Sequence, residues 1–110
     1  MIDLPALQKR VYENKIAKGF NVTDICMEFC YTQMELTEAM DAYIRKKGDV
    51  GEELADVVIY LLGLSEILGI NLEEKILAKV DKNEKRKYAE KNGILMRIDN
   101  IAQSAMPATQ

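Results

Sequence analysis

Residues 54–64 read LADVVIYLLGL, a run that is apolar around the whole circumference of a helix. A surface helix has a single apolar stripe, whereas a helix with apolar residues on every side is covered by other helices. The run is too short to cross a bilayer, which needs about 20 apolar residues. It therefore predicts the central helix of an all-α, four-helix-bundle-like protein.

Apolar residues at helical spacing, together with capping residues, predict four helices. The first occupies residues 4–17, with Asp3 as its N-cap and Gly19 at its end. The second runs from residue 23 or 24 to residue 45, and the third from residues 49–52 to residue 68. The fourth follows Asn71 and is expected to end at Asn92 and Gly93. We expect residues 1–92 to form one domain and residues 93–110 a C-terminal tail, β-like at residues 94–98 and partly disordered.

The composition narrows the classes of partner. The chain has 110 residues, a formal net charge of −3 and no histidine, so nothing in its overall charge favours nucleic acid or an anionic membrane surface. The N-terminal sequence lacks the basic start and apolar core of a signal peptide. Cys26 and Cys30 lack the further ligands that a zinc site needs, and we expect them to be reduced thiols packed in the core. These features predict a cytoplasmic protein.

Asp56 interrupts the apolar run and has no polar face to occupy. Glu53 lies one turn before it on the same side of the helix, and Tyr60 lies one turn after it. A buried carboxylate is costly unless it is paired with a cation or binds a metal. The alternative is that Glu53 and Asp56 lie at the start of the helix and face solvent or an arginine.

The second helix carries another acidic pair, Glu35 and Glu38, with Glu28 two turns earlier on nearly the same stripe. These acids could also form a solvated face. However, the short connection at residues 46–48 makes the second and third helices antiparallel neighbours, so that the two acidic pairs can oppose each other. Converging carboxylates without histidine or thiolate form an all-oxygen site, which suits Mg²⁺ or Mn²⁺.

The fourth helix carries cations at a spacing that places them on one face of the helix. Lys79, Asn83 and Arg86 follow each other at intervals of four and three residues. They could form an ordinary exposed basic face or bind the phosphates of a substrate. Further candidates for substrate contact, named by position only, are Lys15, Lys18, Phe20, Asn21 and Tyr60.

Taken together, these residues resemble the MazG-like all-α nucleoside triphosphate pyrophosphohydrolases, which are related to dimeric dUTPases and dCTP pyrophosphatases. The resemblance covers residues 7–88 and is strongest over residues 52–88. That segment looks like the family's Glu-x-x-Asp helix, its Leu-Gly-Ile turn and its Lys-x-x-x-Asn-x-x-Arg segment, in that order.

The preceding helix departs from the family pattern. Glu35 and Glu38, within YTQMELTEAM, match the last two acidic positions of that pattern, but Tyr31 and Thr32 stand where the family has earlier metal-binding glutamates. Three explanations remain open. Glu28 or Glu38 could supply the missing ligand, the metal could be bound more weakly, or the chain could have altered or lost catalysis.

The resemblance implies Mg²⁺-dependent hydrolysis of a nucleoside triphosphate, in particular a dNTP, to the monophosphate and pyrophosphate, as a step in cleaning the nucleotide pool. It also implies that Glu35, Glu38, Glu53 and Asp56 are metal ligands, with Glu28 as a further candidate. Glu35 and Glu38 are the candidates for orienting or deprotonating the attacking water. The alternatives are a relative that binds nucleotide or metal without turnover, and a helical bundle that only binds partners.

The second helix carries more apolar surface than its neighbours would cover. Besides an expected core stripe of Phe29, Leu36 and Met40, another flank holds Met27, Tyr31 and Met34. The resemblance to the MazG-like family points the same way, because relatives assemble their sites beside or across subunit interfaces. We therefore expect a homodimer, or a tetramer built from two dimers.

Overall fold

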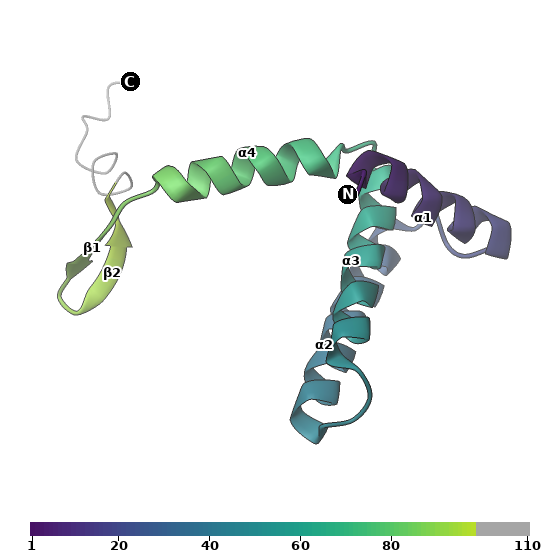
Figure 1. Cartoon of the computed structure of the whole chain (residues 1–110), viewed down its shortest axis with the longest axis horizontal. Coiled ribbons are helices and arrows are strands. Elements are labelled where there is room, and N and C mark those ends of the chain that lie inside the picture. The colour runs from purple at the N-terminus through teal and green to yellow at the C-terminus, as the bar shows by residue number, and fades with distance from the viewer. Residues whose placement is uncertain (99–110) are drawn as a thin grey trace. The chain divides into compact units, whose positions relative to one another are not determined.

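The computed structural model describes residues 1–98. In chain order these residues form helices α1 (Leu4–Lys18), α2 (Ile25–Arg45), α3 (Val50–Ile67) and α4 (Leu72–Lys85), followed by strands β1 (Tyr88–Lys91) and β2 (Ile94–Arg97) (Figure 1). The all-α prediction, with four helices, is therefore confirmed. The chain divides into two compact units, Met1–Glu73 and a second that begins at Glu74, so the division falls inside α4.

Each of the first three helices begins at an aspartate. Asp3 accepts a hydrogen bond from the backbone N–H of Ala6 at 3.1 Å, and Asp24 accepts one from that of Met27 at 3.0 Å. Asp49 caps α3 in the same way through Gly51 N–H, at 2.9 Å. An N-cap of this kind satisfies a donor that the helix itself leaves unpaired. The predicted starts of these helices are confirmed to within two residues.

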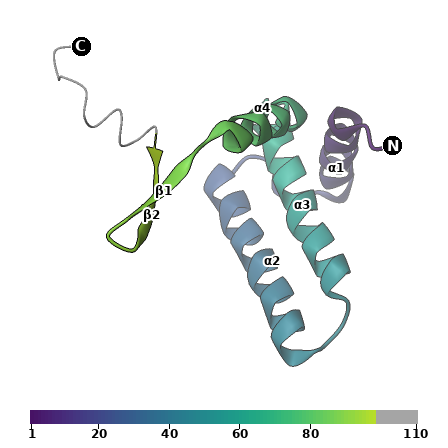
Figure 2. The same cartoon turned by 60° about the vertical axis from the view of Figure 1, so that its left-hand side comes forward.

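Helices α2 and α3 lie side by side and antiparallel, joined by a short turn (Figure 2). Lys46, which caps α2, and Gly48 both have positive φ, which reverses the chain within this turn. The buried apolar residues lie on these two helices. Ala39 and Ala42 on α2 are small, which allows the helices to approach closely, and Leu62 and Leu64 on α3 are almost fully buried.

Helix α1 packs against α3, and two polar contacts hold it to α3 and to α2. Gln8, which is buried, donates hydrogen bonds to Glu66 Oε2 at 3.0 Å and to the carbonyl of Ile70 at 2.6 Å. Near the other end of α1, Lys15 forms a buried ion pair with Glu28 on α2. Because hydrogen bonds are directional, these contacts fix the position of α1 against α3 at Gln8 and against α2 at Lys15.

Within the unit Met1–Glu73, the expectation that α3 is covered on all sides is wrong. In the unit that contains them, α2 and α1 cover only part of α3, and the proposed core stripe of α2 is also uncovered. Cys26 and Cys30 are exposed as well, so the prediction of buried core thiols is wrong too. The following apolar side chains of α2 and α3 are between 41% and 57% exposed: Phe29, Leu36, Met40, Leu54, Val58 and Leu61.

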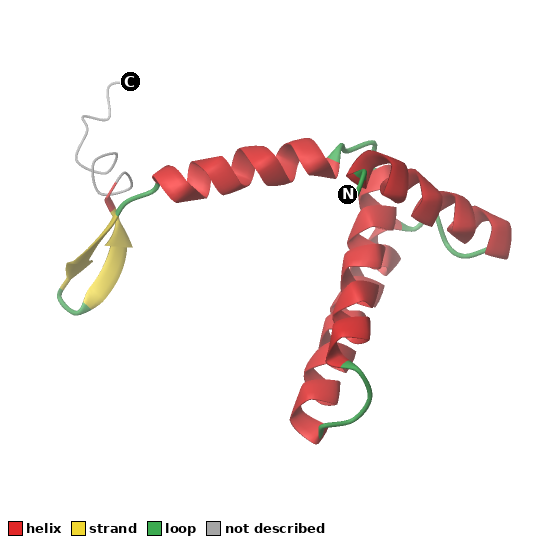
Figure 3. Cartoon of the chain, in the orientation of Figure 1, coloured by secondary structure: helices red, strands yellow, loops and turns green. Residues whose placement is uncertain are grey.

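The fourth helix is shorter than predicted, because Asn92 and Gly93 form a hairpin turn and not a helix end. Both residues have positive φ, of 54° and 78°, as a type I′ turn requires. The turn joins β1 to β2 in an antiparallel pair with Lys91 opposite Ile94 (Figure 3). The helix ends at Lys85, and the expected boundary after residue 92 lies within the turn.

The β-like run predicted from residue 94 is confirmed by strand β2. The partial disorder predicted for the tail concerns residues 99–110, which lie outside the described residues. Among the helices of residues 1–98, none is both long enough and apolar enough to cross a membrane.

Candidate metal site and adjoining cavity

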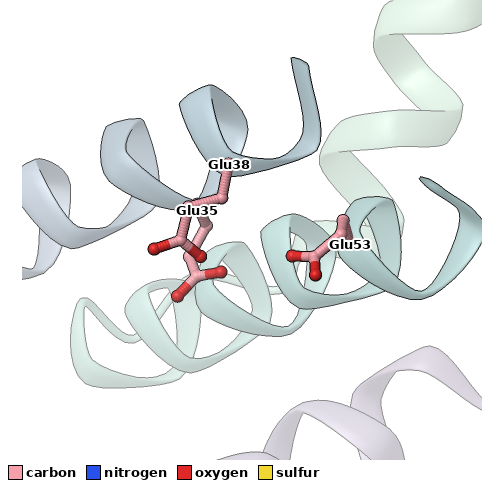
Figure 4. A group of neighbouring side chains, drawn as sticks. All are labelled: Glu35, Glu38 and Glu53. Atoms are coloured by element: carbon pink, nitrogen blue, oxygen red, sulfur yellow. The ribbon is translucent and has the colours of Figure 1, made fainter. Parts of the chain in front are cut away.

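Three carboxylates from α2 and α3 converge. Each of Glu35, Glu38 and Glu53 has an oxygen within 4.8 Å of an oxygen of the other two. Figure 4 shows Glu35 and Glu38 extending from α2 toward α3, which carries Glu53. The arrangement follows from the antiparallel pairing, because the first turn of α3 lies opposite the second half of α2.

Asp56 lies one turn beyond Glu53 on α3 and is half-buried. It falls outside the cluster of three, but its charge acts on Glu35. The pKa of Glu35 is raised above its ordinary value, first by burial, and then by the negative charges of Glu38, Asp56 and Glu53. The other three predicted acids, Glu38, Glu53 and Asp56, therefore all act on Glu35 through their charges.

The donor set fits a hard divalent cation. The four side chains offer only carboxylate oxygens, which Mg²⁺ and Mn²⁺ prefer. Mutual repulsion and burial both oppose ionisation of Glu35 in the metal-free protein, and a bound cation would remove this opposition. Glu35, Glu38 and Glu53 could hold such an ion, with Asp56 beside them.

Glu28 lies outside the cluster of Glu35, Glu38 and Glu53. Its Oε1 accepts a hydrogen bond from Lys15 Nζ, and its Oε2 accepts one from Asn21 Nδ2 at 3.0 Å. The residues at the family's other acidic positions are also engaged. The hydroxyl of Thr32 donates to the carbonyl of Glu28 at 2.8 Å, and the Tyr31 ring meets the Tyr60 ring edge-on, with centroids 6.3 Å apart.

An open cavity of about 460 Å³ lies between α1 and α3. Of the sequence candidates for substrate contact, Lys15, Phe20 and Tyr60 line it, whereas Lys18 does not. Asn21 instead organises the loop after α1: its side chain accepts a hydrogen bond from Asp24 N–H at 3.1 Å and donates one to Glu28.

Two further lining residues, Arg10 and Asn14 of α1, were not among the sequence candidates. Arg10 follows Leu7 by three residues and precedes Asn14 by four, so these three residues share one face of α1, and this spacing was the available signal.

Tyr60 belongs to both regions. Its ring lines the cavity, while Glu35 and Asp56 act on its hydroxyl. Burial is the largest cause that raises the pKa of Tyr60, followed by the charges of Glu35 and Glu28. The phenol is therefore a neutral hydrogen-bond donor at neutral pH, placed next to the acidic residues.

The basic residues of the second unit form a group of their own. Arg86 Nη1 donates to Asn83 Oδ1 at 2.9 Å, and the charge of Arg86 is the largest cause that lowers the pKa of Lys79. Lys79 and Arg86 thus lie on one side of this unit, as their spacing predicted. Arg86 also lines a cavity of about 360 Å³ with Lys82, Lys85 and Lys87.

In a comparison with known protein families, the sequence model of a family described as the MazG-like family matches residues 28–99. The matched segment includes both acidic pairs and the basic group at residues 79–86. It begins after Lys15 and the cavity face of α1. No curated protein and no solved structure matches the chain.

Proposed function

This chain belongs to the MazG-like family, and we propose that it hydrolyses a nucleoside triphosphate, in particular a dNTP, to the monophosphate and pyrophosphate. The observation that supports this proposal is the convergence of Glu35, Glu38 and Glu53 within 4.8 Å, in the part of the chain that the family matches. We further propose that the protein acts in the cytoplasm on the nucleotide pool.

Glu35, Glu38, Glu53 and Asp56 would hold Mg²⁺, with Mn²⁺ as a substitute. When bound, the cation supplies charge neutralisation at the phosphates and lowers the pKa of water. Glu35 and Glu38, one turn apart on α2, are the candidates for orienting the attacking water and accepting its proton at a carboxylate oxygen.

The remaining parts of the substrate have their own candidate contacts. Lys79, Asn83 and Arg86 offer two cations and an amide, which suit phosphate oxygens. The cavity lined by Phe20 and Tyr60 offers aromatic surface for the nucleoside, and its volume lies in the range of small-molecule sites.

We also propose that the protein is a homodimer, or a tetramer of two dimers. The support is the apolar surface of α2 and α3 that the single chain leaves exposed, including Leu36, Met40, Leu54 and Val58. Exposed apolar side chains on neighbouring helices are what an interface between subunits would cover.

The decisive experiment measures pyrophosphate release from a panel of dNTPs and NTPs, with Mg²⁺, with Mn²⁺ and with EDTA. We expect pyrophosphate release from at least one nucleotide, and we expect this release to require the metal. Release that is equal in EDTA would contradict the metal site.

The second candidate is a relative that binds nucleotide without turnover. It is motivated by Thr32, which stands at a position where the family has a glutamate. The hydroxyl of Thr32 donates a hydrogen bond to the backbone carbonyl of Glu28. Nucleotide binding without release of pyrophosphate from any member of the panel would favour this candidate.

A further inference from the structure

Lys15 and Glu28 form a buried ion pair outside the acidic cluster. Their side chains are 10% and 1% exposed, and each oxygen of Glu28 already accepts a hydrogen bond, one from Lys15 and one from Asn21. A carboxylate whose oxygens are both engaged by donors on neighbouring elements is held in place. Glu28 is therefore not oriented as a fourth ligand of the cluster of Glu35, Glu38 and Glu53.

Lys15 is confined on several sides. Its Nζ reaches Glu28, and the same atom lies 5.1 Å from the centroid of the Tyr60 ring, within the range of a cation–π contact. Its stem passes α3 at Gly63, where an added Cβ would lie 3.1 Å from Lys15 Cδ. If Lys15 turned toward a phosphate, the buried Glu28 carboxylate would keep only the hydrogen bond from Asn21 and lose its cation, which is strongly unfavourable.

Tyr60 connects the Lys15–Glu28 ion pair with the cavity and the acidic residues. Lys15 lies over its ring, and Tyr31 contacts the ring edge-on at an interplanar angle of 64°. The Tyr60 ring lines the cavity between α1 and α3, and Tyr60 follows Asp56 by one helical turn. The Tyr60 ring thus borders the cavity on one side, and the charges of Glu35 on α2 and Asp56 on α3 act on Tyr60.

We propose that Glu28 is a positioning residue, which holds Lys15 against Tyr60 and so fixes the wall between the nucleoside cavity and the metal-binding carboxylates. This inference rests on the proposed function. Since Lys15 lines the proposed nucleoside cavity and Glu28 lies outside the cluster of Glu35, Glu38 and Glu53, we expect loss of the pair to weaken substrate binding and to leave the chemical step nearly unchanged.

The test uses the double variant Lys15→Met/Glu28→Gln. Each single substitution leaves a buried charge without its partner, whereas the double variant removes both charges at similar side-chain volume and is expected to fold. The control is Asp41→Asn/Arg45→Met, which also removes one negative and one positive charge. This ion pair lies on an exposed face of α2, with Arg45 Nε 2.7 Å from Asp41 Oδ1.

For the double variant we expect KM for the best nucleotide to rise about tenfold and kcat to stay within about twofold of the wild type. Mn²⁺ affinity, measured by titration calorimetry, should equal that of the wild type. In the ¹³C-tyrosine NMR spectrum the Tyr60 ring signals, assigned with Tyr60→Phe, should move. The control variant should match the wild type in all of these measurements.

Two results would overturn the inference. A large loss of Mn²⁺ affinity in a folded double variant would make Glu28 a metal ligand, and an unchanged KM with only an altered melting temperature would make the pair purely structural.

Binding of a non-hydrolysable α,β-imido dNTP separates this inference from the proposed function. If the wild type binds the analogue but releases no pyrophosphate from dNTPs, the proposed function fails, and weaker analogue binding by the double variant still supports the positioning of Tyr60. If the wild type releases pyrophosphate and the double variant has the wild-type KM, only the positioning fails. If the wild type binds no nucleotide, both are overturned.

Discussion

Lys15 crosses α3 directly over Gly63, and a Cβ at Gly63 would lie 3.1 Å from Lys15 Cδ. Val11 Cγ1, at 3.4 Å, closes the same space from a neighbouring turn of α1. A lysine on a surface could move aside by a few tenths of an ångström, but Lys15 is buried and held at its end by Glu28. The absence of a side chain at residue 63 is therefore what allows α1 to dock on α3 with this ion pair in place.

We expect Gly63→Ala to destabilise the protein by roughly 1 kcal/mol in urea unfolding. Alanine gains about 1 kcal/mol over glycine within a helix, but overpacking against Lys15 and Val11 costs about 1–3 kcal/mol. In the Lys15→Met/Glu28→Gln background the loss should be smaller, because the end of residue 15 is then free to move. A net gain of stability in the wild-type background would show that Lys15 is not held in place.

Glu53→Gln and Asp56→Asn should each lower metal-dependent pyrophosphate release by roughly 100-fold or more. Substitution of residues that only support metal ligands already lowers metal affinity or activity by about 10–100-fold. The circular dichroism spectrum should keep its helical form. Glu52→Gln is the matched control, because Glu52 is an exposed acid in the same turn of α3 and lies outside the cluster. Wild-type activity in both site variants would refute the assignment of these residues to a metal site.

Glu35→Gln should stabilise the metal-free protein at pH 7. The pKa of Glu35 is raised in the folded state, so the folded protein binds the proton more tightly than the unfolded chain does. The penalty for ionised Glu35 is thus fully present above the folded pKa and disappears as the pH falls below the ordinary value near 4.5. Partial exposure screens the effect, and we expect a gain below about 1 kcal/mol.

Thermal unfolding in EDTA between pH 4 and pH 7 measures this effect. The stability difference between Glu35→Gln and the wild type should shrink as the pH is lowered. Saturating Mg²⁺ should reverse its sign at pH 7, because only the wild type keeps the complete site. A difference that does not change with pH would mean that Glu35 does not carry the penalty.

Lys79→Ala or Arg86→Ala should raise KM about tenfold or more, through lost charge-assisted contacts to phosphate worth about 1.5–3 kcal/mol each. Melting temperature should change little for Lys79→Ala, because Lys79 is exposed. Lys75→Ala is the control, since Lys75 is an exposed cation of the same helix and does not line the cavity beside Arg86. An unaltered KM in both variants would leave the basic group as a solvated face.

Val58→Lys should dissociate the proposed dimer and lower hydrolysis, because it places a charge in an apolar interface. Val58 is half exposed in the single chain, so the lysine need not disturb the fold of the monomer. Sedimentation velocity at micromolar concentration measures the assembly, and Ala6→Lys, on an exposed face of α1, is the control. A wild type that sediments as an active monomer would exclude the assembly.

The sequence alone determined the features that depend on local bonding and on short connections. Asp3 and Asp49 are helix caps because their carboxylates reach backbone N–H groups two or three residues away. Because the turn after α2 is short, α3 packs antiparallel to α2. This packing brings Glu35 and Glu38 opposite Glu53.

One local signal was misread. Asn92 and Gly93 suit both a helix end and a hairpin turn, because each of these structures needs residues with positive φ. Only the pairing of Tyr88–Lys91 with Ile94–Arg97 decides between them, and this pairing depends on contacts across the turn.

The tertiary structure alone decided the partner of Glu28. By its spacing on α2 this residue could have joined the metal ligands, faced solvent or paired with a cation from another element. Its pairing with Lys15 depends on where α1 docks, which is set by Gln8 at one end of α1 and by the gap at Gly63 near the other. Spacing along one helix gives the direction of a side chain, but the charge it meets there belongs to another helix, and only the packing of the two brings them together.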